Sequence, residues 1–133
     1  MTPIDPVKQA EELAQIFYNL SNAVDDFRLR PANYATLSPA DQERLKGQAQ
    51  ALASRAQQCT ADAMGAILRG IQAHLANIKQ ATQAAQDALG RLSDVAKGIA
   101  IVDSAVALVA SIASGNLGSV GDSVQGLYQA ISG

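Results

Sequence analysis

The sequence is short of the side chains that most catalysis requires. Its 133 residues include one histidine, His74, one cysteine, Cys59, and no tryptophan. A single cysteine cannot form a disulfide within the chain, which excludes a secreted scaffold held together by disulfides and favours a reducing compartment. A catalytic Cys–His pair would need both residues on adjacent turns in space, whereas in one continuous helix they would lie about 22 Å apart. We therefore expect no enzymatic activity, with Cys59 as a small apolar residue and His74 as a half-exposed packing residue.

The sequence also lacks the motifs that bind metals and phosphate. The glutamates are Glu11, Glu12 and Glu43, so the chain has neither a Glu-x-x-His pair nor two histidines four residues apart, the usual ligand patterns of helical metal sites. The glycines of residues 115–121 follow a predicted helix instead of a strand, and no lysine accompanies them. We therefore predict no metal site and no cofactor.

Neither sign of charge predominates. Lysine and arginine number 10 against 12 aspartates and glutamates, for a net charge of −2, and the two signs are interspersed along the chain. Such a distribution has no basic stripe that would attract nucleic acid, so we expect no nucleic-acid partner. Residues 1–10 show no basic segment followed by an apolar one, which predicts no cleavable signal peptide and a cytoplasmic location by default. Export by a bacterial system that needs no such signal is the alternative.

What the sequence does contain is a helical pattern. Hydrophobic residues make up 48% of the chain and aromatic residues only 4%, so the core must be built from aliphatic side chains and alanine, the residue with the highest helix propensity. The first helix is predicted to begin at Asp5 and Pro6 and to end before Pro31. Apolar residues recur along it at steps of three and four, which predicts one buried stripe: Leu13, Phe17, Leu20, Val24 and Phe27.

The segment from Pro31 to Leu37 is predicted to be a loop. It lies between the end of the first helix and a second strong helix start, in which Ser38 is the N-cap and Pro39 takes the first helical position. Because binding residues are often carried by loops, we expect Asn33 and Tyr34 to be exposed recognition residues.

A helical rhythm without further proline runs from Pro39 to Lys97. As a single rod this segment would be roughly 90 Å long, and its apolar stripe, from Leu45 to Leu92, would be uncovered. We therefore expect at least one break, at Cys59–Thr60, in the segment Gly65–Gly70 or at Gly90–Asp94. A homodimer through the stripe is the other way to cover it.

The final third of the chain becomes strongly apolar. Between Gly98 and Gly121 the only charged residue is Asp103, so we expect a central core helix here. Ser114-Gly115-Asn116 predicts a turn, because glycine tolerates the left-handed conformation after a helix end, and the apolar stripe that follows completes a helical hairpin. Small side chains lie on the remaining side of the helix predicted before this turn, where they would let a neighbouring backbone approach: Ala100, Ser104, Ala107, Ser111 and Ser114.

Asp103 most needs a physical explanation. A carboxylate in an apolar segment is costly unless it faces water, pairs with a cation or lies near a helix start, and we favour the last because Gly98 is placed to end the preceding helix. A functional carboxylate, pH-responsive or paired with a partner, is the alternative. Val106 and Leu108 follow in the same segment, and we take all three as candidate interaction residues. A central Asp costs about 2.5 to 3.5 kcal/mol on insertion into a bilayer, so we favour a buried core helix over a transmembrane one.

These patterns predict an all-α protein with a single domain, residues 1–133. We expect an elongated bundle of four to five helices with a long central helical stretch and a C-terminal apolar hairpin. We interpret it as a non-enzymatic bacterial binding or assembly module of the immunity, adaptor or scaffold type. It would act through protein–protein contacts, as a homodimer or in a hetero-complex, with helix pairing of the coiled-coil kind.

The alternative is a membrane-active protein. From about Pro39 to Gly121, long helices rich in alanine and glutamine are followed by an apolar hairpin. This layout resembles that of helical pore-forming toxins of the cytolysin A or haemolysin BL kind. The resemblance implies a soluble form in which the hairpin is buried, and it assigns no role to individual residues.

Overall fold

The computed structural model describes residues 6–59, 65, 67, 70–92 and 94–132. These residues are almost all helical and include no strand, which confirms the all-α prediction. The described part of the chain contains six α-helices, so the expected number of four to five is not confirmed. The elements are α1 (Pro6–Leu29), α2 (Pro31–Thr36), α3 (Pro39–Gln58), the 3₁₀ helix η1 (Gln72–His74), α5 (Leu75–Arg91), α6 (Val95–Ala113) and α7 (Leu117–Ser132).

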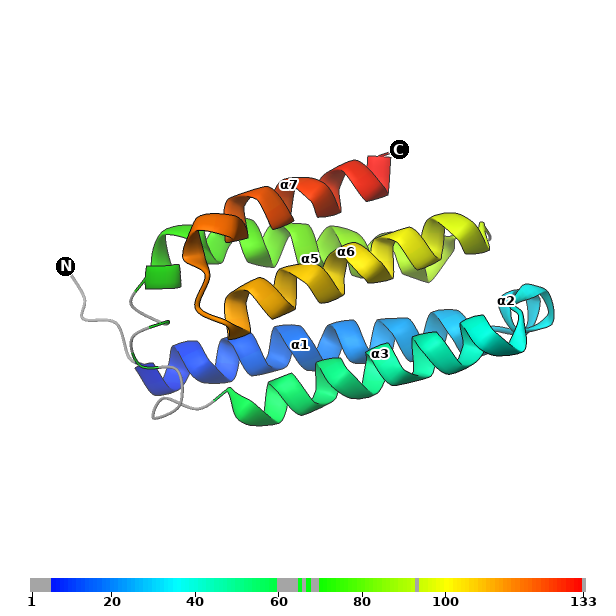
Figure 1. Ribbon diagram of the computed structural model, residues 1–133, viewed down its shortest axis with the longest axis horizontal. Coiled ribbons are helices and arrows are strands. Elements are labelled where there is room, and N and C mark those ends of the chain that lie inside the picture. Colours follow the sequence, from blue (N-terminus) through cyan, green and yellow to red (C-terminus); the bar gives the residue numbers. More distant parts are fainter. Residues whose placement is uncertain (1–5, 60–64, 66, 68–69, 93, 133) are drawn as a thin grey trace.

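The long helices lie side by side with their axes nearly aligned (Figure 1). α1 and α3 run in opposite directions and are joined at one end by α2, while α5, α6 and α7 run up and down in succession. α1 packs against α3 and α5, α6 packs against α3 and α7, and α7 also packs against α5. Because α3 and α6 both begin at the α2 end of the molecule, they are parallel neighbours, and this decides which of their side chains meet.

The predicted stripe of α1 forms the centre of the core, where all five of its residues are buried. The α1–α3 contact is close enough for the Ser21 hydroxyl to donate a hydrogen bond to the Ala49 carbonyl at 2.7 Å. Most described residues of the second predicted stripe are buried against the chain's own helices, so this stripe is not available to the homodimer considered above. They are Leu45, Ala49, Leu52, Ala56, Ile71, Ile78, Ala81, Ala85 and Leu89.

The long helical stretch is interrupted at two of the expected places. α3 ends at Gln58, where Cys59 leaves the helical conformation, and α5 ends at Arg91, where Leu92 is extended. The N-cap of α6 is Asp94, whose carboxylate accepts a hydrogen bond from the backbone N–H of Lys97 at 3.2 Å. Thr60, most of the Gly65–Gly70 segment and Ser93 lie outside the described residues, as does the predicted cap Asp5.

The prediction of a loop after Pro31 is wrong, because Pro31–Thr36 forms the short helix α2. Arg30 is extended, as expected before a proline, but Pro31 then occupies the first helical position and starts a new turn. Asn33 is therefore not exposed. Its side chain is 1% exposed, and its amide Nδ2 donates a hydrogen bond to the Phe27 carbonyl at 2.9 Å.

The C-terminal segments form the predicted pair of antiparallel helices, α6 and α7. The chain turns at Gly115, which has a φ of +74°, a conformation that glycine adopts without steric cost. The small-residue seam is used in part: the hydroxyls of Ser111 and Ser123 lie 3.1 Å apart across the two helices. Gly98 does not end a helix but lies inside α6, where the Phe27 ring occupies the space that a side chain would take.

Candidate functional site

Asp103 lies in the middle of α6 and pairs with α3. Its Oδ1 accepts hydrogen bonds from Arg44 Nη2 at 2.7 Å and from Gln48 Nε2 at 2.8 Å. The expectation that a helix start stabilises this carboxylate is wrong, because α6 begins eight residues earlier, at Val95. The cation and amide of α3 offset the cost of placing a charge in an apolar helix.

The outer side of α6 remains uncovered. The large apolar side chains of α6 lie in the core, among them Ile101, Leu108 and Ile112, but only 39% of the residues in its most apolar stretch are buried. Leu108 is fully buried in the core and cannot contact a partner, whereas Val106 is partly buried. We define the α6 face as the exposed alanines on the outer side of this helix: Ala96, Ala100, Ala107 and Ala110.

A shallow groove runs along the boundary between α3 and α6, beside the α6 face. Its volume is about 110 Å³. Apart from Arg55, its lining is apolar, and Val106 is the one predicted interaction residue that reaches it. The other lining residues are Ala51, Leu52, Val109 and Ala110.

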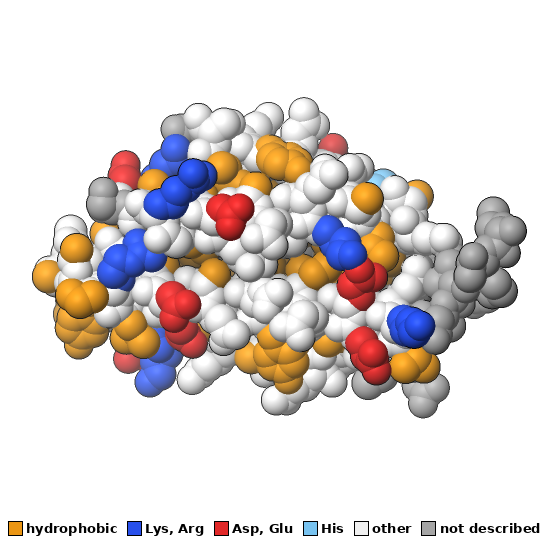
Figure 2. Space-filling model, turned by 180° about the vertical axis from the view of Figure 1, so that it is seen from behind, with side chains coloured by type: hydrophobic (Ala, Val, Ile, Leu, Met, Phe, Trp, Pro, Cys, Tyr) orange, Lys and Arg blue, Asp and Glu red, His pale blue; other side chains and the backbone are white. Residues whose placement is uncertain are grey.

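A second uncovered surface lies at the end of the molecule formed by α2. We call residues 29–43 the tip. Leu29 is 52% exposed and Tyr34 is 60% exposed, more than the other large hydrophobic residues described except Val7. Hydrophobic side chains gather at this end of the molecule (Figure 2, left). Beside Tyr34 is a hollow of about 320 Å³, whose lining consists of Tyr34, Leu37, Pro39, Gln42 and Glu43.

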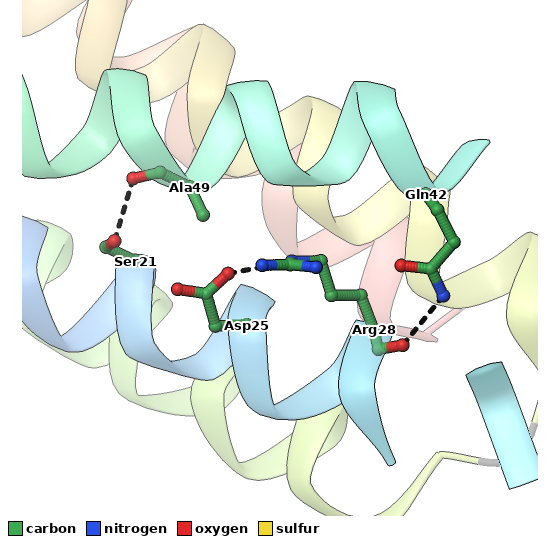
Figure 3. Close-up of polar contacts among 5 residues, drawn as sticks. All are labelled: Ser21, Asp25, Arg28, Gln42 and Ala49. Carbon is green, nitrogen blue, oxygen red and sulfur yellow. Dashed lines mark hydrogen bonds and ion pairs between the residues drawn. The ribbon is translucent and has the colours of Figure 1, made fainter. Parts of the chain in front are cut away.

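Side chains hold the backbone of the tip by hydrogen bonds to main-chain carbonyls at helix ends. The Gln42 amide donates to the Arg28 carbonyl at 2.9 Å (Figure 3). The guanidinium of Arg30 donates to the carbonyls of Leu89 and Leu92, both at 2.9 Å. The last carbonyls of a helix have no partner within it, so these bonds satisfy the ends of α1 and α5. The bond of Gln42 ties α3 to α1, and the bonds of Arg30 tie the residue before α2 to the end of α5.

A polar hollow of about 330 Å³ lies between α1 and α5. Its lining combines two carboxylates, Asp26 and Asp87, with three side-chain amides. The guanidinium of Arg30 also borders the hollow, but its N–H groups already donate hydrogen bonds to the carbonyls of Leu89 and Leu92. The amides are those of Asn19, Asn22 and Gln86.

Cys59 and His74 lie at the ends of different helices, Cys59 after α3 and His74 at the end of η1. Burial raises the pKa of the Cys59 thiol to about 11, so this thiol is protonated at neutral pH and is a poor nucleophile. His74 is half-buried at the end of η1. Within the described ranges, no three His, Cys, Asp or Glu side chains lie close enough to hold a metal ion.

Comparisons of the chain with protein-family models, with curated proteins and with solved structures find no match. The structure defines the class of this protein as all-α. The candidate site consists of its two exposed apolar surfaces, the α6 face and the tip. Of the predicted interaction residues, Tyr34, Asp103 and Val106 reach these surfaces, and Asn33 and Leu108 do not. Sequence reasoning missed Leu29, although its position outside the α1 stripe was a signal that it points away from the core.

Proposed function

We propose that this protein is a non-enzymatic binding or assembly module of the immunity, adaptor or scaffold type, built as an elongated helical bundle. The observation that carries the proposal is the α6 face. An apolar helix that is uncovered on one side, with its single carboxylate already neutralised by Arg44, offers a surface that a second helix would cover.

The spacing of the α6 face favours a helix as the occupant. Ala96, Ala100, Ala107 and Ala110 recur at the three- and four-residue steps of a helix–helix seam, with Asp103 completing the pattern. Small side chains allow two backbones to approach closely. A second copy is the simplest occupant, because a two-fold axis near Asp103 would set each face against its equivalent.

Light scattering and chemical cross-linking of the purified protein test this proposal. We expect association that weakens on dilution and that Ala107→Glu abolishes by placing a charge in the seam. Ala76→Glu, on the exposed side of α5, is the matched control and should associate like the unaltered protein. If the unaltered protein neither self-associates nor retains from a cell extract any protein that Ala107→Glu loses, the proposal is wrong.

One observation favours a second candidate, a membrane-active protein. α6 is long and apolar enough to cross a membrane by length and composition, and it forms a hairpin with α7. Leakage of dye from liposomes at neutral and mildly acidic pH that disappears in Val106→Asp would support this candidate. Absence of leakage and of lipid association at every pH would exclude it.

The absence of enzymatic activity is part of the proposal. Its support is the raised pKa of the Cys59 thiol and the lack, in the part of the chain that the structure describes, of a cluster of His, Cys, Asp or Glu that could hold a metal ion. A cytoplasmic location and the absence of a nucleic-acid partner remain proposals that rest on the sequence. Gel-shift assays with duplex DNA and single-stranded RNA would test the latter, and binding that falls steeply with salt would contradict it.

A further inference from the structure

We propose that the hollow at the tip is a docking site for a short segment of another protein that carries an apolar side chain next to a lysine or arginine. The inference rests on the proposed binding function but concerns a different surface from the α6 face. The apolar side chain would lie against Tyr34, Leu37 and Pro39, and the basic group would meet Glu43.

The apolar part of the hollow resembles an interface more than an ordinary surface. Tyr34 is 60% exposed, and the buried Leu37 also lines the hollow. Leu29, outside the hollow at the end of α1, is 52% exposed. Tyrosine supplies a large contact area at a low cost in conformational entropy, which is why it is enriched among residues that dominate binding energies. The hollow is of the size that accommodates one or two side chains of a partner.

The charge of the hollow specifies the partner's polar group. Of the five residues that line it, Glu43 alone is charged, and no salt bridge involves it in the described part of the chain. A carboxylate beside a tyrosine ring is complementary to a cation, because the ammonium or guanidinium group can pair with the carboxylate and contact the ring face. An acidic segment would be repelled at the same position.

Hydrogen bonds tie the tip to the neighbouring helix ends without any partner present. Asn33 is bonded to the end of α1, Arg30 to the end of α5, and Gln42 of α3 to the Arg28 carbonyl. The bonds of Asn33 and Arg30 attach α2, which carries Tyr34, to α1 and α5, and the bond of Gln42 attaches α3 to α1. A surface that is already ordered loses little entropy on binding, so more of the contact energy appears as affinity.

The same charges argue against a second copy as the occupant. Tip-to-tip docking would have to bring a free basic group to Glu43. Within the tip, Arg30 is bonded to carbonyls of α5 and the turn that follows it, and the neighbouring Arg28 is paired with Asp25 at 2.8 Å. An anionic membrane is also disfavoured, because Glu43 in the hollow has no compensating ion pair among the described residues.

A library of short random peptides displayed on phage is the probe for this site. The immobilised full chain is used to select binders, with Tyr34→Ala protein in solution as competitor in parallel selections. We expect enriched peptides to share an apolar residue adjacent to lysine or arginine. A synthetic peptide of the consensus should bind Tyr34→Ala about tenfold or more weakly than the unaltered protein. Glu43→Lys should weaken it by a similar factor, about tenfold.

Tyr128→Ala is the matched control, because Tyr128 is 39% exposed on α7, outside the tip, and this variant should bind the peptide unchanged. Circular dichroism confirms that each variant is folded. Enrichment of acidic peptides, equal binding by Tyr34→Ala, absence of any enrichment, or self-association that Tyr34→Ala abolishes would each overturn the proposal. Ala107→Glu lies outside the tip. Peptide binding therefore tests the docking site at the tip, and self-association separately tests the proposed function of the α6 face.

Discussion

Arg44 and Asp103, which are 59 residues apart in the chain, form an ion pair that joins α3 to α6, with 2.7 Å between Nη2 and Oδ1. Their side chains are 54% and 39% exposed, so water screens the attraction. The pair therefore serves more to orient the two parallel helices and to neutralise the α6 face than to stabilise the fold. Gln48 lies one turn further along α3, and its amide also donates a hydrogen bond to Asp103.

A double-mutant cycle with Arg44→Ala and Asp103→Ala should give a coupling energy of about 0.2–1 kcal/mol, as for other exposed pairs. Urea unfolding monitored by circular dichroism measures it. A coupling energy well above this range would mean that the pair is more strongly desolvated than the exposures indicate. A coupling energy of zero would mean that water screens the attraction between the two side chains completely.

Gly98→Ala should destabilise the protein by about 1–3 kcal/mol, because the added methyl group would overlap the ring of Phe27, which is fully buried and would have to shift within the core. Gly47→Ala is the control. Gly47 is exposed in the interior of α3 with nothing within 4 Å of an added Cβ, so this change should stabilise the fold by about 0.5–1 kcal/mol. Equal effects of the two substitutions on the urea midpoint would contradict the α1–α6 packing described here.

Asn33→Ala should reduce the free energy of unfolding by about 1–3 kcal/mol, because it leaves the carbonyl of Phe27 without its hydrogen-bond donor in a buried position. Tyr34→Ala, one residue away on the exposed side of α2, should change it by less than about 0.5 kcal/mol. Thermal unfolding of the two variants separates a structural residue from an exposed one. If Tyr34→Ala were the more destabilising of the two, the assignment of Tyr34 to a free surface would be wrong.

The stability of the protein should fall between about pH 9 and pH 11 by an amount that depends on Cys59. Burial raises the pKa of this thiol from 9.0 to about 11, so over this range the unfolded chain releases the thiol proton while the folded chain retains it. The stabilisation is complete below pH 9 and is lost as the pH rises through the folded pKa. Cys59→Ala should lack this component, and its unfolding midpoint should therefore decline less steeply with pH. Identical pH profiles would show that the thiol is not desolvated.

Much of the local structure could be predicted because its causes are local. The α1 stripe, the helix end before Pro31, the start of α3 at Ser38 and the turn at Gly115 each depend on residues within one or two helical turns. The same reasoning failed at Asn33. Pro31 is compatible with either a loop or a new helical turn. The helical turn is stabilised by the hydrogen bond from the Asn33 amide to the Phe27 carbonyl, a contact that the sequence pattern does not indicate.

The sequence by itself therefore determined that this chain is helical, where its helices begin and end at prolines and glycines, and which residues form apolar stripes. Only the tertiary structure decided which stripes are covered, and hence where a partner could bind. The reason is that burial and charge pairing join distant residues: α3 covers α1 and holds Asp103 of α6, while four alanines of α6 and Tyr34 of the tip stay exposed in the described structure. Periodicity within one helix carries no information about which of its neighbours will be present.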